Sequence, residues 1–77
     1  MSTNPRPYLL AAGFSEADLT PMMLDPSRWD LELVIAQIEN HNDPSSAARR
    51  AKRAGPGAAR AEKMHQARVA WLADATD

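Results

Sequence analysis

Apolar residues between positions 31 and 38 recur with the period of an α-helix. The repeating positions, spaced at i, i+3, i+4 and i+7, are Leu31, Val34, Ile35 and Ile38. Asp30 stands directly before this stripe, where a helix N-cap is expected, and Asp25 with Pro26 offers an alternative start one turn earlier. The pattern predicts a helix that buries the stripe and leaves Leu33 and Gln37 on its other side.

Residues 5–24 contain two shorter apolar segments. In the first, Asn4 is placed to cap a helix, two prolines fall in its first turn, and Gly13 can take the left-handed position after its last turn. The second segment allows two interpretations: a helix capped by Ser15, or a later helix capped by Thr20 that begins at Pro21. Because a proline inside a helix costs about 3 kcal/mol, we expect a break near Thr20.

The chain changes in character after residue 42. Asn, Asp, Pro and Ser residues at 42–46 end the preceding helix, and Gly55-Pro56-Gly57 rules out one continuous helix downstream. Residues 45–54 have high helix propensity, but alanine is their only apolar residue type, so we expect them to be exposed. Residues 58–77 form a better amphipathic pattern, with Met64, Trp71 and Leu72 on one face.

Composition favours helices over strands. Ala, Leu, Met, Arg and Glu dominate the 77 residues, and there is no cysteine for a disulfide or a thiolate metal site. We therefore predict an all-α protein with three parts: an acidic three-helix bundle at 1–42, a basic hinge rich in Pro, Gly, Ser and Ala at 43–57, and a C-terminal amphipathic helix at 58–77.

Trp29 and Trp71 are two large apolar side chains in a short chain. The favoured interpretation places both in the core, with the C-terminal helix folded back over the third helix. In the alternative, they anchor an interface, where tryptophan is over-represented.

Charge is divided unevenly along the chain. Residues 1–48 contain two basic and seven acidic residues, whereas residues 49–68 contain seven basic residues and one acidic residue. The basic segment is suited to phosphate contacts with a nucleic acid, although no interleaved aromatic residue or recognition helix predicts base-specific contacts. An acidic protein or capsid-like surface, a solvated linker, and attraction to the acidic bundle are the alternatives. The candidate contact residues are Arg49, Arg50, Lys52, Arg53, Arg60 and Lys63.

Three short motifs occur within residues 5–41: Gly13-Phe14, the run "LTPMML", and an acidic cap followed by "LELVI". Together they resemble the ubiquitin-associated (UBA) domain and its relatives, including the N-terminal domain of elongation factor Ts. Pro21 and Pro26 depart from the smooth second helix of that family. The resemblance implies a UBA-like three-helix bundle that receives a partner's hydrophobic patch on the Gly-Phe loop and the end of the third helix. The residues matching those positions are Gly13, Phe14, Gln37 and Ile38.

Two candidate contact residues also have a purely structural explanation. Phe14 can pair with Leu19 as a hydrophobic staple around the Ser15 cap, so local folding would account for it. Leu33 lies opposite the core stripe, which favours contact with a partner, but the C-terminal helix can cover it instead. The predicted protein-binding residues are Gly13, Phe14, Leu33, Gln37 and Ile38.

Catalysis is not predicted. His41 and His65 lie on different elements, and the chain has no glycine-rich phosphate loop, no metal-ligand spacing and no recognisable nucleophile with a base. We therefore expect no cofactor and no metal. The N-terminal apolar run is too short for a signal peptide or a membrane span, which predicts a cytoplasmic protein, or a virion protein if the chain comes from a phage.

The expected function is binding. The leading hypothesis is a small adaptor or regulator whose bundle docks on a protein partner while the basic arm contacts nucleic acid or another acidic surface. The alternative is a phage virion or assembly protein whose tail orders on neighbouring subunits. A helix-turn-helix regulator is disfavoured, because the third helix carries Asp30, Glu32 and Glu39 and has no basic residue to meet phosphate.

Overall fold

The described part of the chain folds into helices. The computed structural model describes residues 4–52 and 56–76, among which there is no strand. The α-helices are α1 (Arg6–Ala11), α2 (Pro21–Leu24), α3 (Leu31–Asn42), α4 (Pro44–Lys52) and α5 (Pro56–Ala75). Two short 3₁₀ turns, η1 (Glu16–Asp18) and η2 (Pro26–Arg28), flank α2. The predicted all-α fold class is confirmed.

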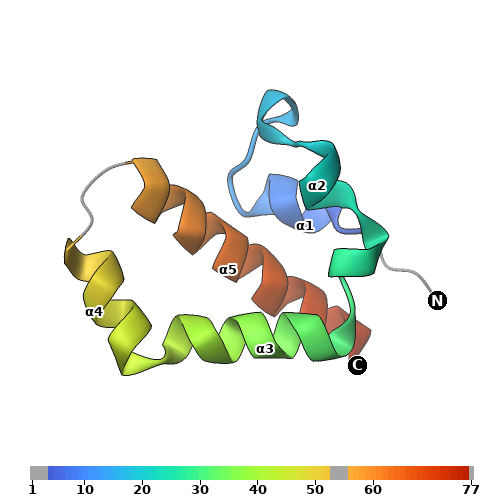
Figure 1. The fold of residues 1–77 in the computed structure, drawn as a ribbon. Helices are drawn as coiled ribbons and strands as arrows, with labels where there is room; N and C mark the ends of the chain where they lie inside the picture. Colours follow the sequence, from blue (N-terminus) through green and yellow to red (C-terminus); the bar gives the residue numbers. More distant parts are fainter. Residues whose placement is uncertain (1–3, 53–55, 77) are drawn as a thin grey trace.

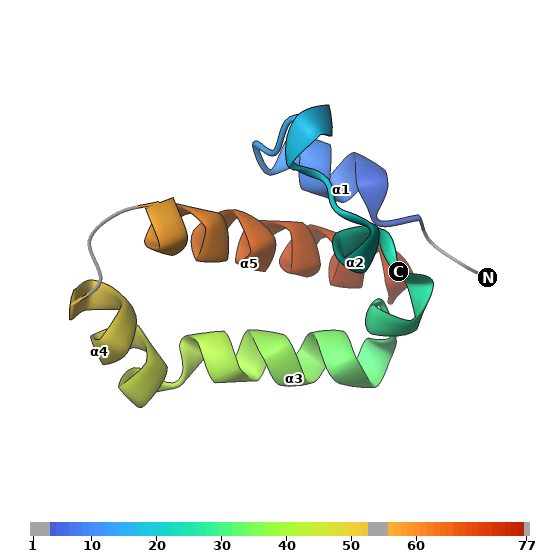
Figure 2. The same ribbon diagram turned by 45° about the horizontal axis from the view of Figure 1, so that its top comes forward.

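The central element is α5. It runs opposite to α3 on one side and packs against α1 on the other, so it lies between these two helices (Figure 1, Figure 2). The hydroxyl of Tyr8 on α1 donates a 2.7 Å hydrogen bond to the carboxylate of Asp74 near the end of α5. At the C-terminal end of α3 the chain turns sharply into α4, which contacts α3 (Figure 1). The C-terminal helix thus folds back over α3, as the favoured interpretation of the tryptophans predicts.

The core is built jointly by the N-terminal segments and α5. Its buried members are Leu9, Phe14, Met23, Trp29, Val34, Ala67 and Trp71. The rings of Trp29 and Trp71 meet at a centroid distance of 5.8 Å with a tilt of 58°, within the range of favourable aromatic pairs. The indole N–H of Trp29 donates to the carbonyl oxygen of Met23 at 2.8 Å, so its polar atom is satisfied inside the core. The prediction that both tryptophans fill the core is confirmed.

The helix α3 buries less of its apolar stripe than its sequence predicts. It begins after Asp30 at the expected position, although the Asp30 side chain makes no capping hydrogen bond, and it buries Val34 and half-buries Ile38. Leu31 and Ile35, however, are 43% and 40% exposed. Because α3 packs mainly against α5 and α4, only a narrow part of its stripe has a neighbour. The predicted burial of the full stripe is therefore wrong for Leu31 and Ile35.

The segment before α3 contains both of the caps that the sequence offered as alternatives. The backbone N–H and the hydroxyl of Ser15 donate to the carboxylate of Asp18, which closes η1. The hydroxyl oxygen of Thr20 then accepts a 3.3 Å hydrogen bond from the N–H of Met23 and caps α2, which begins at Pro21. The expected break near Thr20 lies between these two short elements.

Much of the predicted hinge is helical. The helix α4 begins at Pro44, where the missing N–H of proline costs no helical hydrogen bond. Ser46 is buried, whereas Lys52 at the end of the helix is exposed. Arg53 lies outside the described residues. The division of the chain into parts at 1–42, 43–57 and 58–77 stays a prediction.

Candidate functional site

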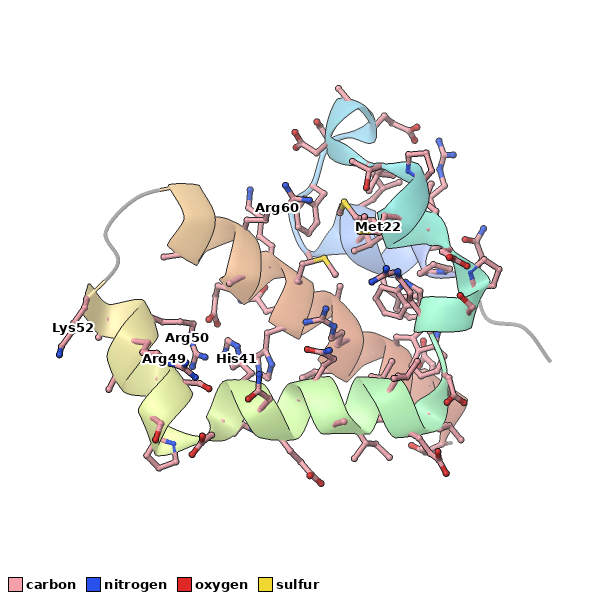
Figure 3. The ribbon with its side chains drawn as sticks, in the orientation of Figure 1. Met22, His41, Arg49, Arg50, Lys52 and Arg60 are labelled. Carbon is pink, nitrogen blue, oxygen red and sulfur yellow. The ribbon has the colours of Figure 1, made fainter. Side chains whose placement is uncertain are left out.

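A cavity of about 250 Å³ opens between α2, η2, α3 and α5, and we name it the methionine cleft. Its apolar walls come from Met22, Met23, Trp29, Leu33 and Met64. Its polar walls come from Arg28, Gln37, Arg60 and Arg68. Figure 3 shows Met22 on α2 and Arg60 on α5 beside the same opening. The cleft therefore joins side chains from both halves of the chain.

The methionine cleft has a buried apolar floor and an exposed apolar rim. Met23 and Trp29 are buried, whereas Met22 and Leu33 are 62% and 46% exposed. Methionine side chains are flexible and polarizable, so they adapt to the shape of a partner. A preformed apolar floor with exposed apolar side chains beside it can take up an apolar side chain of a ligand.

Positive charge surrounds this apolar surface. Arg28, Arg60 and Arg68 line the cleft, and no carboxylate of the described residues does. Arg60 Nη2 donates a long hydrogen bond of 3.6 Å to the sulfur of Met23. Arg68 is half-buried, and this burial lowers the pKa of its guanidinium. None of the three arginines forms a direct ion pair with a carboxylate in the part of the chain described here, although Arg28 acts on Asp25 and Arg60 on Asp18 at longer range.

A second cavity of about 360 Å³ continues along α5 towards α4, and we name it the arginine pocket. It shares Gln37, Arg60, Met64 and Arg68 with the methionine cleft. Its other lining residues are Asn40, His41, Arg50, Gly57 and Ala61. Arg50 Nη2 donates a 2.6 Å hydrogen bond to the backbone carbonyl of His41, which holds this guanidinium at the end of α3. Figure 3 shows Arg50 and His41 close together between α4 and α3.

Two histidines bridge α3 and α5 beside the arginine pocket. The rings of His41 and His65 stack at a centroid distance of 3.7 Å, with their planes 10° apart. His41 Nε2 lies 3.6 Å from a carboxylate oxygen of Glu62. Burial lowers the pKa of His41, and the neighbouring His65, Arg50 and Arg68 lower it further, while Glu62 acts in the opposite direction. Together these effects favour the neutral form of His41.

The predicted protein-binding residues do not form one surface. Leu33 and Gln37, one turn apart on α3, line the methionine cleft together. Phe14 is buried in the core, and Ile38 packs against that core. Gly13 is exposed and has a φ of +116°, in the left-handed region predicted for it, and it lies beside Lys63 instead of the cleft.

The predicted basic residues are also separated. Arg49, Arg50 and Lys52 lie on α4, Arg60 and Lys63 lie on α5, and Arg53 is outside the described residues. In Figure 3, Lys52 points away from the bundle. The ammonium of Lys63 lies 5.7 Å from the centroid of the Phe14 ring, within cation–π distance. These residues therefore do not form one continuous basic arm. Arg50 and Arg60 line the arginine pocket, Lys63 lies over Phe14, and Arg49 and Lys52 are exposed on α4.

Six residues that line the methionine cleft were not among the site residues predicted from the sequence: Met22, Met23, Arg28, Trp29, Met64 and Arg68. For Arg68 a signal exists, because Arg60, Met64 and Arg68 recur every four residues and so share one face of α5. No comparable signal exists for Met22 and Arg28, because their place beside α5 depends on how α2 and η2 fold over it.

The described residues show neither a metal site nor a membrane-spanning helix, and comparison with known proteins assigns no family. Among residues 4–52 and 56–76, no group of three or more His, Cys, Asp or Glu side chains is placed to hold a metal ion. No helix within these ranges combines the length and the apolar character needed to cross a membrane. Comparison with protein-family models, curated proteins and solved structures finds no match for this chain. The resemblance to the UBA domain therefore stays a prediction based on motifs in residues 5–41.

Proposed function

We propose that this protein is a small non-enzymatic adaptor or regulator, and that its methionine cleft binds a partner-protein segment that is both apolar and acidic. One observation carries this proposal. Two exposed apolar side chains, Met22 and Leu33, converge at one opening with three arginines that form no direct ion pair with a carboxylate among the described residues. Exposed apolar surface rimmed by polar groups is typical of protein interaction sites.

The chemistry of the cleft defines its expected occupant. An apolar side chain of the partner would replace water over Met22 and Leu33. An Asp or Glu of the same segment would pair with a guanidinium of the cleft, whose planar fork suits carboxylate oxygens. Charge complementarity of this kind guides association and is screened by salt, so binding should weaken as ionic strength rises.

The exposed end of α4 supports a wider contact with the same acidic partner. Arg49 and Lys52 are exposed, and the Arg49 guanidinium donates to the hydroxyl of Ser46 at 3.3 Å. Neither residue forms an ion pair within the described residues. An acidic partner surface that extends past the arginine pocket would reach both side chains, in keeping with the acidic contact expected of the basic segment.

Site-specific cross-linking tests this function. Leu33→benzoylphenylalanine places a photoreactive group at the rim of the methionine cleft. Ile35→benzoylphenylalanine places the same group at a comparably exposed position on α3 that does not line the cleft. After irradiation in an extract of the source organism, mass spectrometry identifies the cross-linked segments. We expect position 33, and not position 35, to capture a segment that contains both apolar and acidic residues.

A matched set of neutral substitutions then measures the contribution of the rim. Leu33→Asn combined with Met22→Asn removes apolar contact without changing charge, and it should weaken binding of the captured segment at least about tenfold, or roughly 1.4 kcal/mol. Ile35→Asn should leave the affinity unchanged. A captured segment without acidic residues, or an equal loss of affinity in Ile35→Asn, would contradict the proposed function.

A further inference from the structure

The arginine pocket gathers positive charge that the protein does not neutralise. Arg50 from α4 and Arg60 and Arg68 from α5 line it, and none of the described residues that line it is acidic. Among the described residues none of the three forms an ion pair with a carboxylate. Asp18 faces Arg60 only from a different cavity, outside the arginine pocket. Like charges that converge in this way repel one another, and a bound anion would relieve that repulsion.

The N–H groups of these arginines are largely free for a ligand. Arg50 uses one at the carbonyl of His41, 2.6 Å away. Arg60 uses one at the sulfur of Met23, 3.6 Å away. The Arg68 guanidinium has no hydrogen-bond partner within the described residues, although the residue is half-buried. A guanidinium offers several N–H donors in a planar fork that matches the oxygens of a phosphate group.

We propose that the arginine pocket is a binding site for a phosphate monoester group, carried by a small molecule or by a phosphorylated side chain. Three guanidiniums suit a phosphate dianion better than a singly charged carboxylate, because each can form charge-assisted hydrogen bonds to its oxygens. The volume of about 360 Å³ lies within the usual range of small-ligand sites. The site goes beyond the partner contact at the methionine cleft and does not require it.

The histidine pair beside the pocket gives the bound state a measurable signature. Protonation of His41 is disfavoured first by burial and then by the neighbouring His65, Arg50 and Arg68. Glu62 favours it. A dianion in the pocket would offset the field of Arg50 and Arg68 and so raise the pKa of His41. By linkage, the same coupling makes phosphate bind more tightly at lower pH as long as the ligand remains a dianion.

An NMR titration of the full chain with inorganic phosphate, at ionic strength held constant with chloride, tests the site. We expect saturable shifts of the His41 ring signals and a higher His41 pKa at saturation. Arg68→Gln and Arg60→Gln should each weaken phosphate binding at least tenfold. Glu62→Gln, which removes the carboxylate beside His41, should strengthen it severalfold. Because Arg60 is exposed, its variant remains informative if Arg68→Gln does not fold.

Arg49→Gln is the control for a general loss of positive charge. Arg49 is next to Arg50 on α4 but does not line the pocket. Phosphate affinity should not change in this variant. Equal weakening in Arg49→Gln and Arg60→Gln, or no saturable shift with millimolar phosphate, would overturn the proposal. The Leu33→Asn, Met22→Asn variant should still bind phosphate, so the failure of one proposal can be told from the failure of the other.

Two phosphate esters then distinguish the sources of the group. A phosphoserine peptide represents a phosphorylated side chain, and a nucleoside monophosphate represents a small molecule. Tenfold tighter binding of one ester identifies that source. If both esters bind with equal affinity and both lose that affinity in Arg60→Gln, the pocket recognises the phosphoryl group alone. If neither ester competes with inorganic phosphate at the pocket, the proposal fails.

Discussion

Gly13 illustrates how a single residue permits a turn on which the core depends. Its φ of +116° lies in the region where residues with a side chain are strained. A Cβ at this position would also lie 3.3 Å from Cε of Lys63, the far part of a flexible side chain. The turn carries the chain from α1 to Phe14, which is buried in the core. Backbone strain, more than crowding, is therefore the reason for glycine here.

Gly13→Ala should lower the free energy of unfolding by more than about 1 kcal/mol, because alanine does not readily adopt this backbone conformation. Urea denaturation followed by circular dichroism measures the change. Gly57→Ala is the matched control: a Cβ there meets nothing within 4 Å, and the residue lies in α5. That variant should be neutral or more stable by up to about 1 kcal/mol. Equal losses in both variants would argue against the role of positive φ.

Among the elements, the pairing of α3 with α5 combines an apolar region with a titratable one. Val34 on α3 and Trp71 on α5 belong to the core, while His41 and His65 stack near the end of α3. Protonation of His41 would place a positive charge between the two helices, close to the guanidiniums of Arg50 and Arg68. In addition, Nδ1 of His65 is buried without a hydrogen-bond partner among the described residues. The contact between these helices should therefore depend on pH.

Stability should fall on mild acidification. Burial lowers the pKa of His41 in the folded protein, so below about pH 6.5 the unfolded chain binds more protons than the folded one. The stabilising contribution is complete above that pH and is lost as the pH falls through the folded pKa. Urea unfolding in phosphate-free buffer between about pH 7.5 and 5 should show this decline, and His41→Gln should reduce it. The same decline in His41→Gln as in the unaltered protein would show that other groups cause it.

For the protein as a whole, α5 is the element that completes the core. It lies between α1 and α3, and it supplies Ala67 and Trp71 to a core whose other members lie in residues 9–34. Chains of about 40 residues rarely have enough core to fold alone without a disulfide, a metal or a partner chain. We therefore expect the N-terminal bundle predicted at 1–42 to depend on the C-terminal helix for its stability.

A chain that ends at Asn42 should lack a cooperative unfolding transition. Circular dichroism during heating measures this directly. Adding a peptide of residues 56–77 should restore helicity, because it returns Trp71 to the core. The same peptide with Trp71→Ala should not, since truncating a buried tryptophan costs about 3–5 kcal/mol. A cooperative transition of the shortened chain alone would instead support the independent bundle predicted from the sequence.

Several features of the fold could be predicted because their causes are local. Thr20 caps α2 directly before Pro21, and Asp30 precedes the first residue of α3. Each cap or proline acts on its neighbours within a few residues, so its effect is present in a short stretch of sequence. The burial of Ile35 was predicted wrongly for the opposite reason. Periodicity identifies an apolar face but not how much of it finds a neighbour.

The site was only partly predictable. Leu33 and Gln37 are four residues apart, and this spacing predicts that they share one face of α3. Both residues line the methionine cleft. Phe14 had two acceptable explanations, a staple residue or a binding residue, and the sequence pattern does not distinguish them. In the structure Phe14 is a buried core residue beneath Lys63, and the choice between the two explanations stays a prediction.

Helix type, the starts of α2 and α3, the left-handed turn and the division of charge follow from the order of residues alone, because caps, prolines, glycines and periodicity act over short distances along the chain. The methionine cleft and the arginine pocket follow from packing. They exist because α5 returns between α1 and α3 and brings Arg60 and Arg68 beside Met22, Leu33 and His41. Contacts between such distant positions depend on how the helices pack around the core. Short-range sequence patterns do not predict that packing.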